Sequence, residues 1–178
     1  MGGAAHSRVT SCPLSIVTGA PGAGKSSTVE ALIAREPSFL VFDADWLLDA
    51  TSLLTGQTLT EASSLWPQYR RLWLTIAQIV ERNGRSTVLF IPVTPPEIAE
   101  LLPDPWRGRV RWCLLDCDDQ TRRERLQGRD WPQDAIDEAI DDGEALRGAI
   151  TCTIDTSRRR PDEVAAEICA WSNVSALA

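Results

Sequence analysis

The segment at residues 19–26 constrains this chain more than any other, because its letters G-A-P-G-A-G-K-S fit the pattern G-x-x-x-x-G-K-[ST]. The glycines allow backbone N–H groups to converge on a phosphate chain. The ammonium of Lys25 can reach the terminal phosphates, and the hydroxyl of Ser26 suits a Mg²⁺ ion. An apolar run at residues 14–17 precedes the segment, and residues 27–34 follow it with helical spacing. Strand, glycine loop and helix form the context in which such a segment binds phosphate, so we predict a P-loop here.

Composition is typical of a soluble protein with one domain. The 178 residues are 43% hydrophobic and 24% charged, and the net charge of −7 argues against a nucleic-acid-binding surface, which is normally basic. No apolar run approaches the length of a membrane span, and no secretory leader is visible. The five cysteines lack zinc-site spacing, and we interpret them as free thiols in a reducing cytoplasm. We expect a cytoplasmic monomer or homodimer.

The domain organisation that we predict is a flexible tail at residues 1–11 and a single domain at residues 12–178. The only histidine, His6, lies in the tail, so catalysis by a histidine base is not expected.

Predicted strands and helices alternate along the chain. Strands are expected at residues 14–17, 39–42, 86–91, 110–115 and 150–154. Helices are expected at residues 27–34, 61–82, 95–102, 119–127, 134–147 and 161–171, and the Ser-, Thr- and Gly-rich residues 51–60 are expected to form a loop. This alternation predicts an α/β fold of the P-loop NTPase type, a three-layer αβα sandwich with a five-stranded parallel sheet.

Asp43 and Asp45 stand at the end of the second predicted strand, at the edge where open α/β sheets bind ligands. Phosphoryl transfer to a hydroxyl needs Mg²⁺ near the β- and γ-phosphates and a carboxylate that orients or deprotonates the attacking oxygen. Two aspartates one residue apart could divide these tasks. The alternative is that Asp45 only caps a helical turn that begins at Trp46, which leaves Asp43 unexplained.

Arginines gather at residues 122–129, where R-L-Q-G-R follows Arg122 and Arg123. A guanidinium can stack on adenine, bind phosphate oxygens in pairs and stabilise charge on a transferring phosphoryl group. The alternative is a solvated helix face with i,i+4 ion pairs. Because the cluster follows a P-loop and a fourth strand, we favour the functional interpretation.

Taken together, residues 14–171 resemble the P-loop small-molecule kinases, which include nucleoside monophosphate kinases, shikimate and gluconate kinases, and chloramphenicol phosphotransferase. The resemblance rests on G-A-P-G-A-G-K-S, on F-D-A-D at residues 42–45, on R-L-Q-G-R at residues 125–129 and, more weakly, on D-T-S-R-R-R-P at residues 155–161. It implies that Arg125 stacks on adenine, that Arg129 reaches phosphate and that these arginines open a small lid at residues 126–133. It also implies that Thr156 and Arg158 flank the adenine.

The resemblance to the shikimate kinases divides the two aspartates. Their first aspartate faces Mg²⁺ and their second holds the acceptor hydroxyl. This assigns Asp43 to the metal, together with Ser26, and Asp45 to the base. The stretch that begins at Asp45 and Trp46 also resembles the segment with the proposed catalytic aspartate of chloramphenicol phosphotransferase, so Trp46 is a candidate for the acceptor site.

The sequence departs from these families on the acceptor side. No glycine triplet follows the third predicted strand, which argues against shikimate as the acceptor, and no aspartate ends that strand, so Asp43 must carry more of the metal contact. A nucleotide acceptor would need arginines for its phosphate. Arg70 and Arg71 could serve, or they could simply be solvated. The acidic residues 134–144 form either a solvated face or an attractive surface for a cationic acceptor.

The sequence therefore predicts a Mg²⁺- and ATP-dependent kinase that phosphorylates a hydroxyl group of a small metabolite or antibiotic-like acceptor. Lys25, Asp45 and Arg129 are the predicted catalytic residues, and Asp45, Trp46 and Arg70 the predicted acceptor contacts. Two alternatives stay open, namely a nucleoside or nucleotide kinase and a non-catalytic ATP-binding sensor or assembly module. The predicted nucleotide contacts are Gly19, Ala20, Pro21, Gly22, Ala23, Gly24, Lys25, Ser26, Ser27, Arg125, Thr156 and Arg158.

Overall fold

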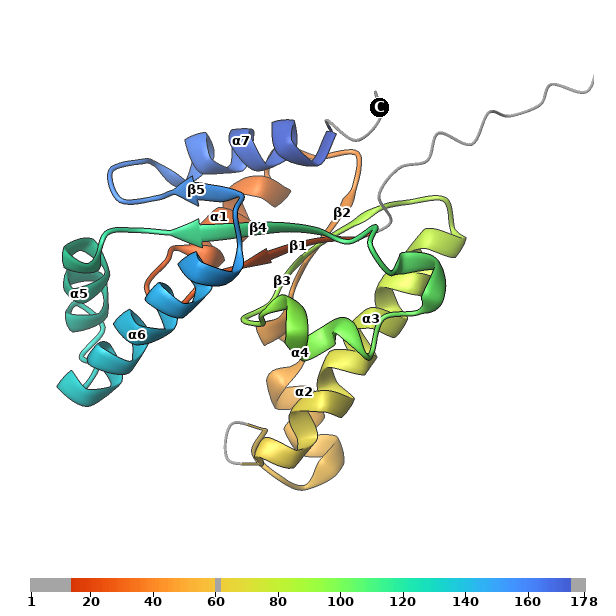
Figure 1. The fold of residues 1–178 in the computed structure, drawn as a ribbon, viewed down its shortest axis with the longest axis horizontal. Coiled ribbons are helices and arrows are strands. Elements are labelled where there is room, and N and C mark those ends of the chain that lie inside the picture. The colour runs from red at the N-terminus through yellow and green to blue at the C-terminus, as the bar shows by residue number, and fades with distance from the viewer. Residues whose placement is uncertain (1–13, 60–61, 174–178) are drawn as a thin grey trace, which may run out of the picture.

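The centre of the molecule is a parallel sheet, and this computed structural model describes it with its helices over residues 14–59 and 62–173. The strands are β1 (Leu14–Thr18), β2 (Leu40–Asp43), β3 (Thr87–Phe90), β4 (Arg111–Asp116) and β5 (Thr153–Asp155). They lie in the order β2-β3-β1-β4-β5, and each neighbouring pair is parallel (Figure 1). The predicted five-stranded α/β sheet is confirmed. The predicted tail at residues 1–11 lies outside the described residues.

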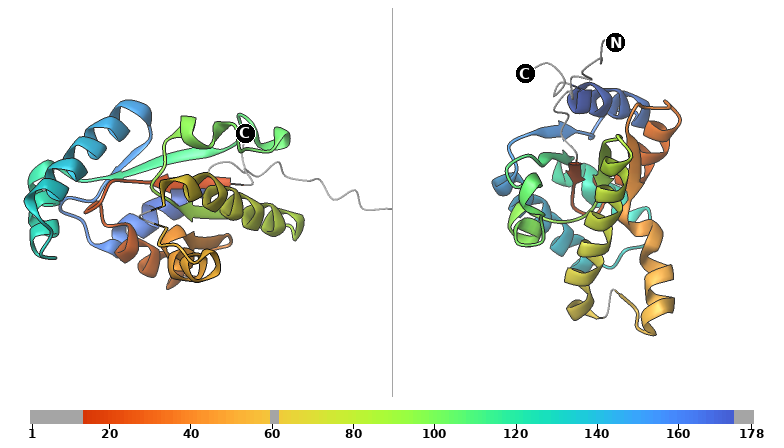
Figure 2. Two further views of the ribbon diagram at one scale, coloured as in Figure 1. Left: turned by 90° about the horizontal axis from the view of Figure 1, so that it is seen from below. Right: turned by 90° about the vertical axis from the view of Figure 1, so that its right-hand side faces the viewer.

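Helices cover both faces of the sheet (Figures 1 and 2). They are α1 (Lys25–Ile33), α2 (Leu48–Thr55), α3 (Trp66–Arg82), α4 (Pro95–Ala99), α5 (Asp119–Gln127), α6 (Gln133–Ala149) and α7 (Pro161–Asn173), with short 3₁₀ helices at Ala44–Leu47, Ser63–Leu65 and Asp104–Trp106. No helix in the described ranges is long and apolar enough to cross a membrane. The four cysteines within those ranges are free thiols.

Alternation along the strands sends side chains to two cores. Val17 of β1 packs with α1 and α7 on one face, whereas Ile16 packs with Tyr69 and Trp73 of α3 on the other. On this second face α6 covers β4 through Leu146. Both central strands, β1 and β3, are buried along their whole length, as strands covered on two faces must be. Because all five strands are parallel, their carboxyl ends lie at one edge of the sheet, and α5 lies beside that edge (Figure 1).

The predicted loop at residues 51–60 is wrong in its first half, because α2 continues to Thr55. The hydroxyl of Thr55 donates to the carbonyl oxygen of Thr51 at 2.9 Å, so it bonds within the helix instead of breaking it. Gly56, with φ of 68°, ends the helix in the left-handed conformation that glycine adopts without strain. Leu53 and Leu54 of α2 are both exposed, so the apolar residues of this helix do not form a single buried stripe of the kind that predicts a helix.

The connection in which we predict a lid is short. Helix α5 ends at Gln127 and α6 begins at Gln133, so residues 128–132 join two helices that pack on each other through Leu126 and Ile136. A lid over residues 126–133 stays a prediction.

A glycine at the start of the P-loop gives a direct test of the packing at this edge. A Cβ on Gly19 would lie 2.5 Å from the carbonyl oxygen of Leu115, so Gly19→Ala must displace backbone. We expect it to lower the free energy of unfolding by about 1–3 kcal/mol in chemical denaturation. Gly148→Ala on α6 is the matched control, because a Cβ there meets open space. It should raise the free energy of unfolding by about 0.5–1 kcal/mol. Equal effects of the two changes would contradict the packing described here.

Candidate active site

The P-loop runs from the end of β1 to Ser26, the second residue of α1. Gly22 and Gly24 have φ of 78° and 87°, which favours glycine at both places. Gly24 is also the N-cap of α1, and no side chain caps the helix. The first N–H groups of α1 are therefore available to an anion, as phosphate binding at a helix N-terminus requires.

Lys25 lies among charged groups of both signs. Its Nζ donates to the carbonyl oxygens of Gly19 at 2.6 Å and Ala20 at 3.3 Å. Burial lowers the pKa of Lys25 to about 8, although the negative charges of Asp45 and Asp43 act in the opposite direction. The pKa of Lys25 is thus affected by the charges of Asp43 and Asp45.

The two aspartates occupy different environments. Asp43 is buried at the end of β2, and burial raises the pKa of its carboxyl group above the ordinary value. Its Oδ1 accepts a hydrogen bond from the backbone N–H of Asp45 at 3.0 Å, so Asp43 is the residue that caps the 3₁₀ helix at Ala44–Leu47. The alternative in which Asp45 caps this turn is wrong. The Asp45 side chain is exposed, and the hydroxyl of Tyr69 donates to the carbonyl oxygen of Ala44 between the two aspartates.

The residues at this edge fit a nucleotide better than a metal ion alone. No group of three His, Cys, Asp or Glu side chains in the described ranges could hold a metal by itself. Mg²⁺ in phosphoryl-transfer sites takes one or two protein ligands and completes its shell with phosphate oxygens and water. Ser26, on the exposed first turn of α1, and Asp43 would be those ligands.

Helix α5 and the β5–α7 connection bring predicted nucleotide contacts to the P-loop. Arg125 donates to the carbonyl oxygen of Gly22 at 3.0 Å and to the carbonyl oxygen of Thr156 at 2.6 Å. The Thr156 hydroxyl donates to the carbonyl oxygen of Ala23 at 2.9 Å. These bonds use the edge of the Arg125 guanidinium. Arg129 is exposed, yet its charge is close enough to lower the pKa of Lys25.

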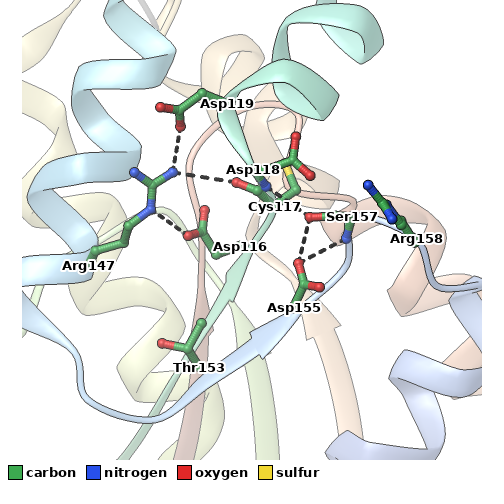
Figure 3. Close-up of a pocket in the computed structure, with 9 residues that line it drawn as sticks. All are labelled: Asp116, Cys117, Asp118, Asp119, Arg147, Thr153, Asp155, Ser157 and Arg158. Carbon is green, nitrogen blue, oxygen red and sulfur yellow. Dashed lines mark hydrogen bonds and ion pairs between the residues drawn. The ribbon is translucent and has the colours of Figure 1, made fainter.

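Two other predicted ligand contacts, Arg158 and Arg70, differ from this group. Arg158 lines a different pocket, and Arg70 is in an ion pair. Arg158 lines a separate pocket at the carboxyl ends of β4 and β5, of about 540 Å³, which no P-loop residue lines (Figure 3). Arg70 pairs with Glu97 at 2.5 Å, and the same Glu97 accepts from the backbone N–H of Thr94 at 2.7 Å. Trp46 is 52% exposed and has an open face.

The sequence interpretation missed the residues that support the P-loop from outside. Arg122 was noted only as part of an arginine cluster, but it is completely buried and bonds to Asp116 and to Pro21 of the loop. Asp116 ends β4, and Arg147 of α6 bonds to it as well (Figure 3). An aspartate after the apolar run of the fourth predicted strand was a usable signal, since the same strand-end argument identified Asp43.

We compared the sequence with models of known protein families. A family described as an AAA domain matches residues 14–150, which include the P-loop and both aspartates. The chain belongs to this AAA domain family. Among curated protein sequences, none matches the chain.

Solved structures with the same fold include kinases and a resistance protein. This AAA domain is similar to a tunicamycin resistance protein from Deinococcus radiodurans, with 22% identity and a TM-score of 0.67 over 90% of this chain and 95% of that one. A sugar kinase from Janibacter sp. HTCC2649 has 19% identity and a TM-score of 0.61 over 89% and 92%. The shikimate kinase from Acinetobacter baumannii has 17% identity and a TM-score of 0.59 over 96% and 97%. The resemblance to the P-loop small-molecule kinase group is thus confirmed in the fold.

The lowered pKa of Lys25 predicts a pH dependence of nucleotide binding by the AAA domain. A phosphate favours the charged ammonium, so binding raises this pKa and must take up a proton once the pH reaches about 8. We expect the affinity for Mg-ATP to fall about tenfold between pH 7 and pH 9, measured by calorimetry.

The matched control for this prediction is Lys25→Arg, whose guanidinium stays charged over the same range. Any binding that it retains should lose most of the pH dependence. A wild-type affinity that is constant from pH 7 to pH 9, without proton uptake, would contradict the lowered pKa.

Proposed function

We propose that this AAA domain is a kinase that transfers the γ-phosphoryl group of ATP to a hydroxyl group of a small molecule, with Mg²⁺. The observation that carries the proposal is the proximity of Lys25 to Asp43 and Asp45, whose charges both act on its pKa. A P-loop lysine marks where the terminal phosphates bind, and an exposed carboxylate beside it can hold an attacking hydroxyl. A nucleotide-binding module without chemistry needs no such carboxylate.

The roles of the residues follow from their environments. Bound Mg-ATP would supply an electrophilic γ-phosphoryl group with part of its charge neutralised. Asp43, buried and rigidly bonded to the Asp45 backbone, suits the metal side, with the Ser26 hydroxyl as the second protein ligand. Asp45, with its exposed side chain, would orient the acceptor hydroxyl and receive its proton. Lys25 and Arg129 would balance the charge that develops on the phosphoryl oxygens.

Arg125 and Thr156 suit the nucleotide base. The edge of the Arg125 guanidinium is held by Gly22 and Thr156, which keeps the plane of the group in one orientation. A fixed guanidinium plane is a stacking surface for adenine. Arg158 lies farther along the same connection and would at most reach the outer side of the base.

The acceptor pocket that we propose is a cavity of about 210 Å³ next to the P-loop. It is lined by Gly19, Ala20, Pro21, Pro92, Val93, Thr94, Glu97, Asp142, Ala145 and Leu146. Neither Asp45 nor Trp46 lines it, so an acceptor bound here would have to extend beyond the cavity for its hydroxyl group to meet Asp45. Its charged wall groups are the carboxylates of Glu97 and Asp142. The ion pair with Arg70 offsets the charge of Glu97 and of Arg70 alike, which leaves the carboxylate of Asp142. This favours a neutral or cationic acceptor over an acceptor with a phosphate, and hence a sugar- or antibiotic-like alcohol over a nucleotide.

A screen for ATP consumption with hydroxylated metabolites, nucleosides and antibiotics tests the proposal. We expect ADP and a phosphorylated product with at least one neutral or amine-bearing alcohol. Preference for a nucleoside monophosphate would support the nucleotide-kinase alternative. Tight binding of Mg-ATP with no product from any acceptor would support the non-catalytic alternative.

Once an acceptor is identified, Asp45→Asn tests whether Asp45 is the catalytic base. The change keeps the shape of the side chain but removes the carboxylate, so turnover should fall about 100-fold or more. The affinity for Mg-ATP should stay within about twofold, since Asp45 is assigned to the acceptor. Asp49→Asn, an exposed aspartate in the first turn of α2, is the control and should keep full turnover. Full turnover in Asp45→Asn would show that the base is another group.

A further inference from the structure

Three successive carbonyl groups of the P-loop are held from outside by side chains. The oxygen of Pro21 accepts from Arg122 at 2.6 Å, that of Gly22 from Arg125 at 3.0 Å and that of Ala23 from the Thr156 hydroxyl at 2.9 Å. Arg122 and Arg125 are three residues apart on α5, so they lie on one face of that helix.

These bonds fix the direction of the N–H groups. A trans peptide group is planar, and its C=O and N–H point in opposite directions. When Arg122 holds the carbonyl of Pro21, the N–H of Gly22, which belongs to the same peptide group, is turned away from α5. The neighbouring N–H of Ala23 is already turned into the loop, where it donates to the carbonyl oxygen of Ala20 at 3.2 Å. Donors outside the loop therefore orient N–H groups toward its interior, where a phosphate would lie.

Arg122 is the most constrained of the three donors. Its side chain is completely buried, and Asp116 accepts from its Nη2 at 2.5 Å. Asp116 is held in turn by the Nε of Arg147 at 2.6 Å. Gly143 of α6 packs directly on the guanidinium, since a Cβ there would lie 2.9 Å from Nη2. The Nε of Arg122 is buried and has no hydrogen-bond partner in the described part of the chain.

A buried ion pair is often no more stable than well-packed apolar side chains of the same volume, because both charges lose their hydration. Stability is therefore a weak reason for this burial, whereas the contacts of Arg122 define a geometry. Here the geometry that they define is the orientation of the Pro21–Gly22 peptide group.

We propose that Arg122 is a positioning residue for phosphate binding, which presets the P-loop through the carbonyl of Pro21, with Asp116 and Arg147 as its support. This inference rests on the proposed function only in that the P-loop binds nucleotide phosphates. It adds that phosphate affinity depends on a residue that touches no phosphate. Because Arg122 and Arg125 both lie on α5, a movement of that helix would also change the loop.

The experiment compares phosphate affinity in variants of the full chain. Arg122→Met removes the donor and keeps an unbranched side chain that reaches as far as the position of Nε. The probes are ATP and inorganic pyrophosphate, each with Mg²⁺, measured by calorimetry at a temperature where circular dichroism shows every variant folded. We expect both probes to bind about tenfold more weakly or worse, by similar factors, because the defect lies in the phosphate loop that the two probes share. Arg122→Lys, with one donor group in place of the fork, should restore part of the affinity.

Arg123→Met is the matched control on the same helix. Its side chain is partly exposed and pairs with Asp137 at 3.2 Å, away from the loop, so both affinities should equal those of the wild type. A role of Arg122 in stability alone would lower the melting temperature and leave both affinities unchanged while the protein is folded.

Gly143→Ala gives a second test that keeps every charge. The added methyl group would push on the guanidinium of Arg122, and we expect a smaller loss of affinity in the same direction; Gly148→Ala on the same helix is its control. If Arg122→Met does not fold, Gly143→Ala decides the question. Wild-type affinity for pyrophosphate in the folded variants would overturn this inference alone. Failure of the wild type to bind either probe would overturn nucleotide binding itself.

Discussion

The orientation of the peptide groups in the P-loop is the constraint on which the rest of the site depends. A phosphate can be bound by backbone N–H groups only if the carbonyl groups of the same peptides point outward. Outward carbonyls beside a packed sheet need donors of their own, because an unpaired buried carbonyl is costly. The donors are Arg122, Arg125 and Thr156, from two segments that are far from the loop in sequence. Donors that are fixed before the ligand arrives need no reorganisation when charge develops.

The same neighbourhood sets the charge balance around Lys25. Burial dominates and lowers its pKa, the two aspartates after β2 act against burial, and Arg122 and Arg129 act with it. Two arginines near a partly buried lysine would be unfavourable without anions. Asp116, which pairs with Arg122, and the two aspartates after β2 supply compensation, and phosphate groups would supply more. A cluster of positive charges around the loop favours a bound anion, as a nucleotide site requires.

Local patterns predicted the strand, glycine loop and helix around Lys25 and the position of Asp43 at the end of a strand. Strand β1, the loop and α1 follow one another directly, so their order alone places Lys25 and Ser26. Asp43 followed from the rule that ligands meet the carboxyl ends of parallel strands. The prediction failed at α2, where hydroxyl side chains that usually favour loops bond within a helix instead. The sequence gives no role to Arg122 by itself, since a charged residue in an arginine-rich helix is normally solvated and its burial depends on what packs over it.

What the sequence alone determined was the identity of the phosphate-binding loop, the α/β alternation and the aspartates after the second strand, because each of these is encoded by neighbouring residues. Only the tertiary structure decided which side chains surround that loop. The sheet order sets β4 beside β1, which brings Asp116 and α5 to the P-loop, and α6 then covers the Arg122 guanidinium at Gly143. It likewise paired Arg70 with Glu97 and so changed the charge of the proposed acceptor side. Such contacts join residues that are distant in the chain, and no local pattern encodes them.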